Sequence, residues 1–145
     1  SLPSAESQRK LLEQVYGVFG IDPSELAFVE AHGTGTRVGD PVEADALGKG
    51  LAQRRTQALP IGSVKSNIGH LEPASGLAGV LKTILALNKG LLPATLHQQT
   101  PNPDIPFDEL NLRVVDRNWT LPDRRGPSLA GVNSFGFGGT NAHVV

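Results

Sequence analysis

The sequence predicts an α/β fold of layered helices and strands, with some antiparallel strand pairing, and three features carry this prediction. Short apolar runs typical of buried strands alternate with longer segments whose apolar residues recur at helical spacing. Three strand-like runs end in polar or glycine-rich residues, at 32–39, 62–70 and 133–141. The last two strand-like runs are joined by a glycine-rich loop, which favours antiparallel pairing near the end of the chain.

The first elements are a helix, a turn and a buried strand. Ser4 is a suitable N-cap, and Gly20 ends a run of apolar residues at helical spacing, namely Leu11, Leu12, Val15 and Phe19. Residues 22–24 (DPS) predict a turn, because aspartate, proline and serine favour such positions. Residues 26–31 then form an apolar run that predicts a buried strand.

A loop over residues 32–39 leads into the second helix. Asp40 can cap this helix, and Pro41 suits the first helical position. Glu43 completes a pair that resembles a capping box. These three residues together predict that the second helix begins near Asp40.

A second strand is predicted over residues 59–64, and Pro73 opens the next helix. Apolar residues cover most of the circumference of this helix, so we expect it to be deeply buried. They are Leu77, Val80, Leu81, Ile84, Leu85 and Leu87. Gly76 and Gly79 would let another backbone approach this helix closely.

The rest of the chain is predicted to be mainly extended. Three proline residues indicate an ordered loop over 98–111. The other predicted segments are a short extended piece at 91–95, strands at 112–115, 129–133 and 142–145, and a turn at 123–127.

Composition limits the classes of function. With 145 residues and a net charge of -1, the chain has the size of one domain and no charge excess that favours nucleic acid or an acidic membrane surface. It contains no cysteine, which excludes a thiol nucleophile and a thiolate metal site within it. The longest apolar stretch, 77–92, is too short for a membrane span, and no signal peptide pattern is present. We therefore expect a cytoplasmic protein without nucleic-acid or membrane partners.

We call the residues that follow the three strand-like runs, at 32–39, 62–70 and 133–141, the strand exits. They are expected to form one site, because ligand sites in open α/β sheets collect at the carboxyl ends of strands. The first exit carries His32, the second carries Lys65 and His70, and the third carries residues 135–139. A lone histidine in a loop would favour a structural role, but Lys65 and His70 beside His32 favour a functional one. In the third loop, the glycines indicate either a plain hairpin with a bulge or backbone N–H groups directed at an oxyanion.

Other readings of these residues are weaker. Residues 33–39 have the spacing GxGxxxG rather than GxGxxG, and Lys65 stands where a dinucleotide site would have an acidic residue. The four histidines lack metal-ligand spacing, so no metal site is predicted. His97 and His143 lie outside the three loops and are interpreted as structural.

The three segments 29–36 (VEAHGTGT), 62–70 (GSVKSNIGH) and 133–143 (NSFGFGGTNAH) resemble the β-ketoacyl synthase, or ketosynthase, domain of modular type I polyketide synthases. The resemblance covers essentially the whole chain, in order. Discrete fatty-acid synthases of the same superfamily are similar, but these forms of the motifs favour the polyketide type. The resemblance implies a thiolase fold, in which α-β-α layers contain a mixed sheet, and residues 1–145 would be its C-terminal half. The nucleophilic cysteine would lie in the N-terminal half, so we expect the chain to be part of a longer protein.

The resemblance also implies an activity. The enzyme would accept an acyl chain from an acyl carrier protein onto the cysteine, decarboxylate a malonyl-type thioester and join the two by Claisen condensation. His32 and His70 would be catalytic as neutral imidazoles that donate N–H bonds to the enolate. Lys65 would support His70 and the electrostatics of the site. Thr34 and Thr36 match positions that hydrogen-bond the pantetheine arm.

In the glycine-rich loop, Phe137 matches a residue whose N–H joins an oxyanion hole and whose ring gates the acyl channel. Phe135 would line the wall, and Gly138 would belong to the same substrate-binding loop. Glu43 and Asn141 would be structural residues that fix loops near the site.

The resemblance implies no directly bound cofactor, since the substrates travel on the phosphopantetheine of an acyl carrier protein. The expected partners are that carrier protein, the N-terminal half of the ketosynthase and a second copy in a homodimer. A different hypothesis is a non-catalytic, ketosynthase-like partner or carrier-protein-binding homologue. The presence of His32, Lys65 and His70 together favours a catalytic parent.

Overall fold

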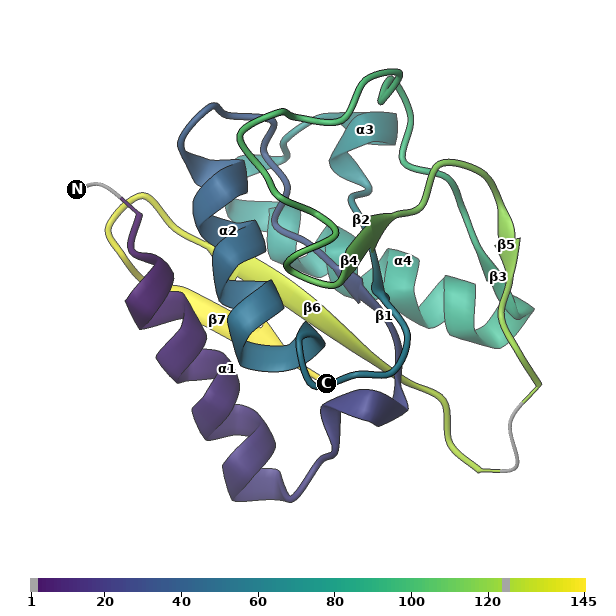
Figure 1. Ribbon diagram of the computed structural model, residues 1–145. Helices are drawn as coiled ribbons and strands as arrows, with labels where there is room; N and C mark the ends of the chain where they lie inside the picture. Colours follow the sequence, from purple (N-terminus) through teal and green to yellow (C-terminus); the bar gives the residue numbers. More distant parts are fainter. Residues whose placement is uncertain (1–2, 124–125) are drawn as a thin grey trace.

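The structure is a computed structural model that describes residues 3–123 and 126–145, and it contains a mixed sheet between helices (Figure 1). The predicted turn at 123–127 includes residues that lie outside this described part. Along the chain the elements are α1 (Ala5–Phe19), a 3₁₀ turn (Pro23–Glu25), β1 (Leu26–Glu30), α2 (Gly39–Leu47), a π-helical turn (Gly48–Ala52), β2 (Leu59–Gly62), α3 (Lys65–Ile68), a second 3₁₀ turn (Glu72–Ala74), α4 (Ser75–Lys89), β3 (Leu91–Leu92), β4 (Leu112–Val114), β5 (Trp119–Thr120), β6 (Leu129–Phe135) and β7 (Asn141–Val144).

The main sheet has the strand order β4-β2-β1-β6-β7. Strand β1 runs parallel to β2 and to β6, and β2 runs parallel to β4, whereas β6 and β7 form an antiparallel hairpin. The predicted mixed sheet with antiparallel pairing near the end is thus confirmed. Because β1, β2 and β6 are parallel neighbours, their carboxyl ends meet at one edge of the sheet.

Helices lie on both faces of this sheet, which confirms the predicted α-β-α layers (Figure 1). One core cluster joins α1 and α2 to the sheet through residues such as Leu12, Leu47 and Val29. A second cluster lies on the α4 side, where Phe28 of β1 packs with Ala86 of α4. Every helix in the described ranges is too short or too polar to cross a membrane.

The predicted ends of α1 are confirmed, but the predicted cap of α2 is wrong. The Ser4 side chain accepts a hydrogen bond from the N–H of Ser7, and Gly20 ends α1 with a left-handed φ of 63°. Asp40 lies inside the first turn of α2 and accepts the N–H of Gly35 at 3.1 Å. Thr36 supplies the acceptor at this helix start, because its hydroxyl receives the N–H of Gly39 at 3.0 Å.

The predicted deep burial of α4 is also wrong. Its inner face packs closely on the sheet, where a Cβ atom added at Gly79 would lie 3.2 Å from Val132. The neighbouring atom belongs to the Val132 side chain, so this glycine makes room for a side chain of β6 rather than for another backbone. The outer face, however, exposes large apolar side chains, namely Leu77 (74%), Leu81 (59%), Ile84 (49%) and Leu85 (48%). Helix α4 therefore has two apolar faces. Within the described ranges, only the inner face is covered, by the sheet.

Three further differences from the predicted elements concern short segments. The strand expected over 59–64 ends at Gly62, because Lys65–Ile68 forms a single helical turn. The short extended piece after α4 pairs as β3 with β5, a strand that was not predicted. The final strand begins one residue before the predicted start, at Asn141, which pairs with Phe135 in the hairpin.

Candidate active site

The loop after β1 is held by a buried carboxylate. Glu43 of α2 accepts the backbone N–H of His32 at 2.7 Å and that of Gly33 at 2.9 Å. Glu43 is only 5% exposed, and burial raises the pKa of its carboxyl group while these N–H groups lower it. The predicted role of Glu43 in fixing this loop is thereby confirmed.

The loop after β2 orients the second histidine. Helix α3 ends at Ile68, and Gly69, which follows it, has a φ of 75° that turns the chain out of the helix before His70. The Nδ1 atom of His70 accepts the backbone N–H of Glu72 at 2.8 Å. An accepting Nδ1 is unprotonated, so the proton of the neutral ring is on Nε2. His70 can therefore donate one N–H bond from Nε2.

The three strand exits meet, as predicted. The rings of His32 and His70 lie with their centroids 5.5 Å apart at an interplanar angle of 88°, so that one ring presents its edge to the other. The ring of Phe135, at the end of β6, lies 5.6 Å from that of His32. One residue from each exit thus contributes to a single cluster at the carboxyl edge of the sheet.

The electrostatics of this cluster favour a neutral His32. Burial lowers the pKa of His32 to about 4, and the neighbouring Lys65 and His70 side chains act in the same direction. At neutral pH the ring is therefore an uncharged imidazole, with an Nδ1 atom that has no hydrogen-bond partner in the described part of the chain. Burial also lowers the pKa of Lys65, while the carboxylates of Glu30 and Glu43 act in the opposite direction.

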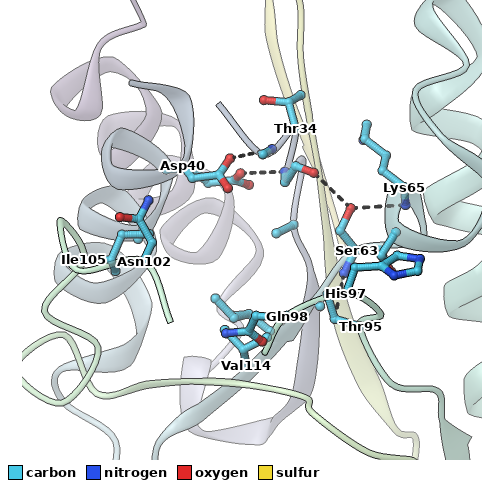
Figure 2. Close-up of a pocket in the computed structure, with 18 of the residues that line it drawn as sticks. Thr34, Asp40, Ser63, Lys65, Thr95, His97, Gln98, Asn102, Ile105 and Val114 are labelled. Carbon is cyan, nitrogen blue, oxygen red and sulfur yellow. Dashed lines mark hydrogen bonds between the residues drawn. The ribbon is translucent and has the colours of Figure 1, made fainter. Parts of the chain in front are cut away.

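A cavity of about 530 Å³ lies between α2, the sheet and the loop that follows β3 (Figure 2). Thr34 borders it, and the hydroxyl oxygen of Thr34 lies 3.3 Å from that of Thr36. Sequence reasoning missed this cavity, because the loop that closes it has no recognisable motif. Its polar lining includes Thr34, Asp40, Ser63, Lys65, Thr95, His97, Gln98 and Asn102.

The two histidines predicted to be structural differ. His97 is exposed, has a φ of 61° and lines this cavity, so its contacts do not support a structural role. His143 is 9% exposed and forms hydrogen bonds through both ring nitrogens, to Tyr16 at 3.1 Å and to Asn133 at 2.6 Å. The structural prediction is confirmed for His143.

The glycine-rich loop adopts a tight hairpin turn in which Gly139 has a left-handed φ of 84°, the pattern of a type I turn followed by a bulge. The N–H of Gly136 donates to the carbonyl of Thr140 at 2.8 Å, and the N–H of Gly139 donates to the carbonyl of Gly136 at 3.1 Å. Phe137 is 95% exposed and Gly138 is also exposed. Of the predicted residues in this loop region, Phe135 therefore lies against His32, whereas Phe137 and Gly138 lie at the surface.

Acid should destabilise the fold through His143. Burial lowers the pKa of His143 to about 4, below its ordinary value of 6.5. Between these two values the unfolded chain binds a proton that the folded chain excludes, so stability is present above about pH 6.5 and falls toward pH 4. The expected loss is about 2–3 kcal/mol from this group. Urea unfolding across that pH range would measure it.

The matched control for this prediction is His143→Phe, which removes the titrating ring nitrogens. This variant should be less stable at neutral pH but should lose less stability on acidification than the parent. Because burial also lowers the pKa of His32, part of the acid sensitivity should remain. Parallel pH profiles for parent and variant would exclude His143 as a source of the effect.

Comparison with known proteins places this arrangement in a family. Residues 1–99 match the model of the β-ketoacyl synthase C-terminal domain, and residues 101–145 match that of the ketoacyl-synthetase C-terminal extension. The chain is 53% identical over 146 residues to polyketide synthase GfsA of Streptomyces halstedii, covering 99% of the chain and 2% of that protein. It is 48% identical over 146 residues to the hybrid PKS-NRPS synthetase pynA of Aspergillus niger, covering 100% of the chain and 4% of that protein.

Solved structures agree in both fold and sequence. The ketosynthase from module 6 of the bacillaene synthase of Bacillus subtilis 168 matches with a TM-score of 0.92 and 44% identity, over 99% of this chain and 26% of that one. Ketosynthase twelve of the bacillaene polyketide synthase of Bacillus amyloliquefaciens matches with a TM-score of 0.91 and 44% identity, over 97% of this chain and 26% of that one.

These matches confirm the thiolase-like fold that the sequence motifs imply, and they locate it in the C-terminal part of a ketosynthase. The chain spans 2% and 4% of the length of these two curated relatives. It spans 26% of each of the two solved ketosynthase chains. The chain belongs to the β-ketoacyl synthase family, as the C-terminal domain of a polyketide synthase ketosynthase.

Proposed function

We propose that residues 1–145 are the C-terminal subdomain of a ketosynthase that carries out decarboxylative Claisen condensation in polyketide biosynthesis. The observation that carries this proposal is the pair of imidazoles at the carboxyl edge of the sheet, with ring centroids 5.5 Å apart. One ring is kept neutral by burial, and the other has its proton directed to Nε2. Two such donors suit an oxygen on which negative charge develops.

In the proposed reaction, the malonyl carboxylate leaves as carbon dioxide and its bonding electrons form an enolate. The enolate oxygen accepts N–H bonds from His32 and His70. The enolate carbon then attacks the carbonyl of an acyl thioester on the cysteine of the N-terminal half, and the cysteine thiolate leaves. Lys65 supports this step electrostatically, because a half-buried ammonium near His32 favours negative charge on the enolate.

We propose that the substrates arrive on the phosphopantetheine of an acyl carrier protein, with no cofactor bound directly to this chain. The hydroxyl groups of Thr34 and Thr36 support this role, since they lie 3.3 Å apart and Thr34 borders a cavity at the same edge of the sheet. In this proposal they hydrogen-bond the amides of the pantetheine arm. Phe135, Phe137 and Gly138 would line the path of the acyl chain.

The N-terminal half of the ketosynthase is the proposed partner of the outer face of α4. That face forms an apolar groove with a volume of about 650 Å³, and Leu77 and Leu81 in it are largely exposed. Exposed apolar surface of this extent is typical of an interface. We also propose that the complete enzyme is a homodimer in the cytoplasm.

The chain alone should not catalyse condensation. It contains no cysteine to carry the acyl group, and the outer face of α4 lacks its proposed cover. The complete ketosynthase, incubated with acyl and malonyl carrier proteins, should form a β-ketoacyl product that mass spectrometry detects. The 145-residue chain should form none under the same conditions, and elongation by the chain would contradict the proposal. Absence of carbon dioxide release by the complete protein would instead indicate a non-catalytic homologue.

Phe137 should control which acyl chains enter. Its ring is 95% exposed on a loop with glycines on both sides, where the backbone has the greatest conformational freedom. In the complete ketosynthase, Phe137→Ala should accept short and long acyl thioesters with less discrimination than the parent. Rates of self-acylation across a chain-length series would measure this. Phe19→Ala, which removes an exposed ring at the end of α1, serves as a control, and an unchanged ratio of rates for Phe137→Ala would exclude a gate.

A further inference from the structure

A row of buried polar side chains crosses the molecule from α1 to the loop that carries His32. The hydroxyl of Tyr16 lies 3.1 Å from Nε2 of His143, and Nδ1 of His143 lies 2.6 Å from Oδ1 of Asn133. The Nδ2 atom of Asn133 donates to the carboxylate of Glu43 at 2.9 Å. Each of these residues is at most 9% exposed. The row ends on the same Glu43 oxygen that accepts the N–H of His32.

The chemistry of these groups allows one arrangement of protons. A carboxylate only accepts, so Asn133 must present its NH₂ group to Glu43 and its carbonyl oxygen to His143. Nδ1 of His143 must then donate, which leaves Nε2 to accept the hydroxyl proton of Tyr16. All the donors therefore run in one direction, from Tyr16 toward Glu43.

Gly131 of β6, which has no side chain, leaves space for the His143 ring and the Tyr16 hydroxyl. A Cβ atom at Gly131 would lie 2.8 Å from Cε1 of His143 and 3.2 Å from the hydroxyl of Tyr16. Any larger residue at this position of β6 would therefore displace the ring or the hydroxyl. The absence of a side chain at Gly131 is thus required for the row to form.

We propose that Tyr16, His143 and Asn133 are positioning residues that hold the Glu43 carboxylate in the orientation that fixes His32. This inference rests on the proposed function, in which His32 donates to the enolate. The Glu43 oxygen shared by Asn133 and His32 is the point of coupling. Without the Asn133 contact, Glu43 can rotate about its side-chain bonds, and the backbone of His32 and Gly33 loses its fixed acceptor.

Two substitutions of His143 separate positioning from simple packing. An asparagine side chain places its amide nitrogen near the position of Nδ1, so His143→Asn keeps a donor toward Asn133 and loses the contact with Tyr16. A glutamine side chain reaches the position of Nε2, so His143→Gln keeps the contact with Tyr16 and loses the donor toward Asn133. Both variants remove the ring, and a purely structural role would affect them equally.

In the complete ketosynthase, His143→Gln should lower kcat for malonyl decarboxylation about tenfold, as expected for one lost hydrogen bond. KM and the rate of self-acylation should change by less than about twofold. His143→Asn should stay within about threefold of the parent kcat. Lys10→Ala, on the exposed side of α1, is the control variant. Equal losses in both His143 variants, or a parallel loss of self-acylation, would overturn the proposal.

A second measurement does not depend on activity. Hydrogen exchange of the peptide that contains residues 30–36, followed by mass spectrometry, should be faster in His143→Gln than in His143→Asn or the parent, because the amides of His32 and Gly33 lose a fixed acceptor. If the parent proves inactive, the proposed function fails, but this exchange difference still supports or refutes the row. Should His143→Gln not fold, Asn133→Leu carries the same test, because it removes the donor to Glu43 directly, and unchanged exchange in that variant would count against the proposal.

Discussion

Replacement of His70 by alanine in the complete ketosynthase should lower malonyl decarboxylation on the order of 10²-fold or more, by analogy with oxyanion-hole donors. Decarboxylation places negative charge on the thioester oxygen, and Nε2 of His70 is one of two donors directed to it in the proposed mechanism. The Nδ1 atom of His70 is already occupied by the N–H of Glu72, so the ring has a fixed orientation. Its loss leaves a single donor on the enolate.

Self-acylation should survive the same substitution. Transfer of an acyl group to the cysteine requires a thiolate and an oxyanion hole, but it does not form an enolate. His32→Ala should lose decarboxylation at least as strongly, because burial keeps that imidazole neutral and hence able to donate. Lys65→Ala should also suppress decarboxylation, since it removes the positive charge near His32.

A paired assay on the same variants separates the two steps. Transfer of a radiolabelled acyl group to the protein reports self-acylation, and carbon dioxide released from malonyl carrier protein reports decarboxylation. Lys10→Ala, on the exposed side of α1, is the control variant. A histidine variant that releases carbon dioxide at the parent rate would show that this residue has no enolate role.

Much of this site is predictable from the sequence because strand exits are local features. His32, His70 and Phe135 each follow a short apolar run, and parallel strands bring their carboxyl ends to one edge. The pairing of β1 with both β2 and β6 then places the three exits side by side. No long-range information is needed beyond the assumption of an open parallel sheet.

Other features depend on contacts between distant segments. The apolar pattern of α4 indicates burial on every side, but it does not say whether the covering surface belongs to the same chain. Asp40 is a residue type that often caps helices. However, the hydroxyl of Thr36 accepts the N–H at the start of α2, because the loop folds back on this end of the helix. The row from Tyr16 to Glu43 joins four elements, so no local motif could indicate it.

Replacement of Lys82 by methionine should cost about 3–5 kcal/mol of folding free energy, because it leaves a buried carboxylate without its partner. The side chain of Glu30, at the end of β1, is 2% exposed and forms an ion pair with Lys82 of α4, whose side chain is 12% exposed. Burial raises the pKa of Glu30, and Lys82 acts in the opposite direction. Removal of the ammonium therefore leaves an unpaired charge or forces the carboxyl group to bind a proton.

Urea unfolding followed by the fluorescence of Trp119, the single tryptophan, would measure the change. Lys89→Met makes the same substitution at an exposed position of α4 and should cost less than about 1 kcal/mol. A loss from Lys82→Met as small as that of the control would show that the ion pair contributes little.

The double variant Glu30→Leu with Lys82→Met identifies what the pair contributes beyond charge. It removes both ions, so it should recover much of the stability that Lys82→Met loses. It should not recover all of it, because Glu30 also accepts the backbone N–H of Val64 at 2.6 Å, directly before α3. An unpaired N–H at that point costs about 1–3 kcal/mol. A full recovery would mean that this N–H finds another acceptor, and that the start of the segment from Lys65 to His70 is held by other contacts.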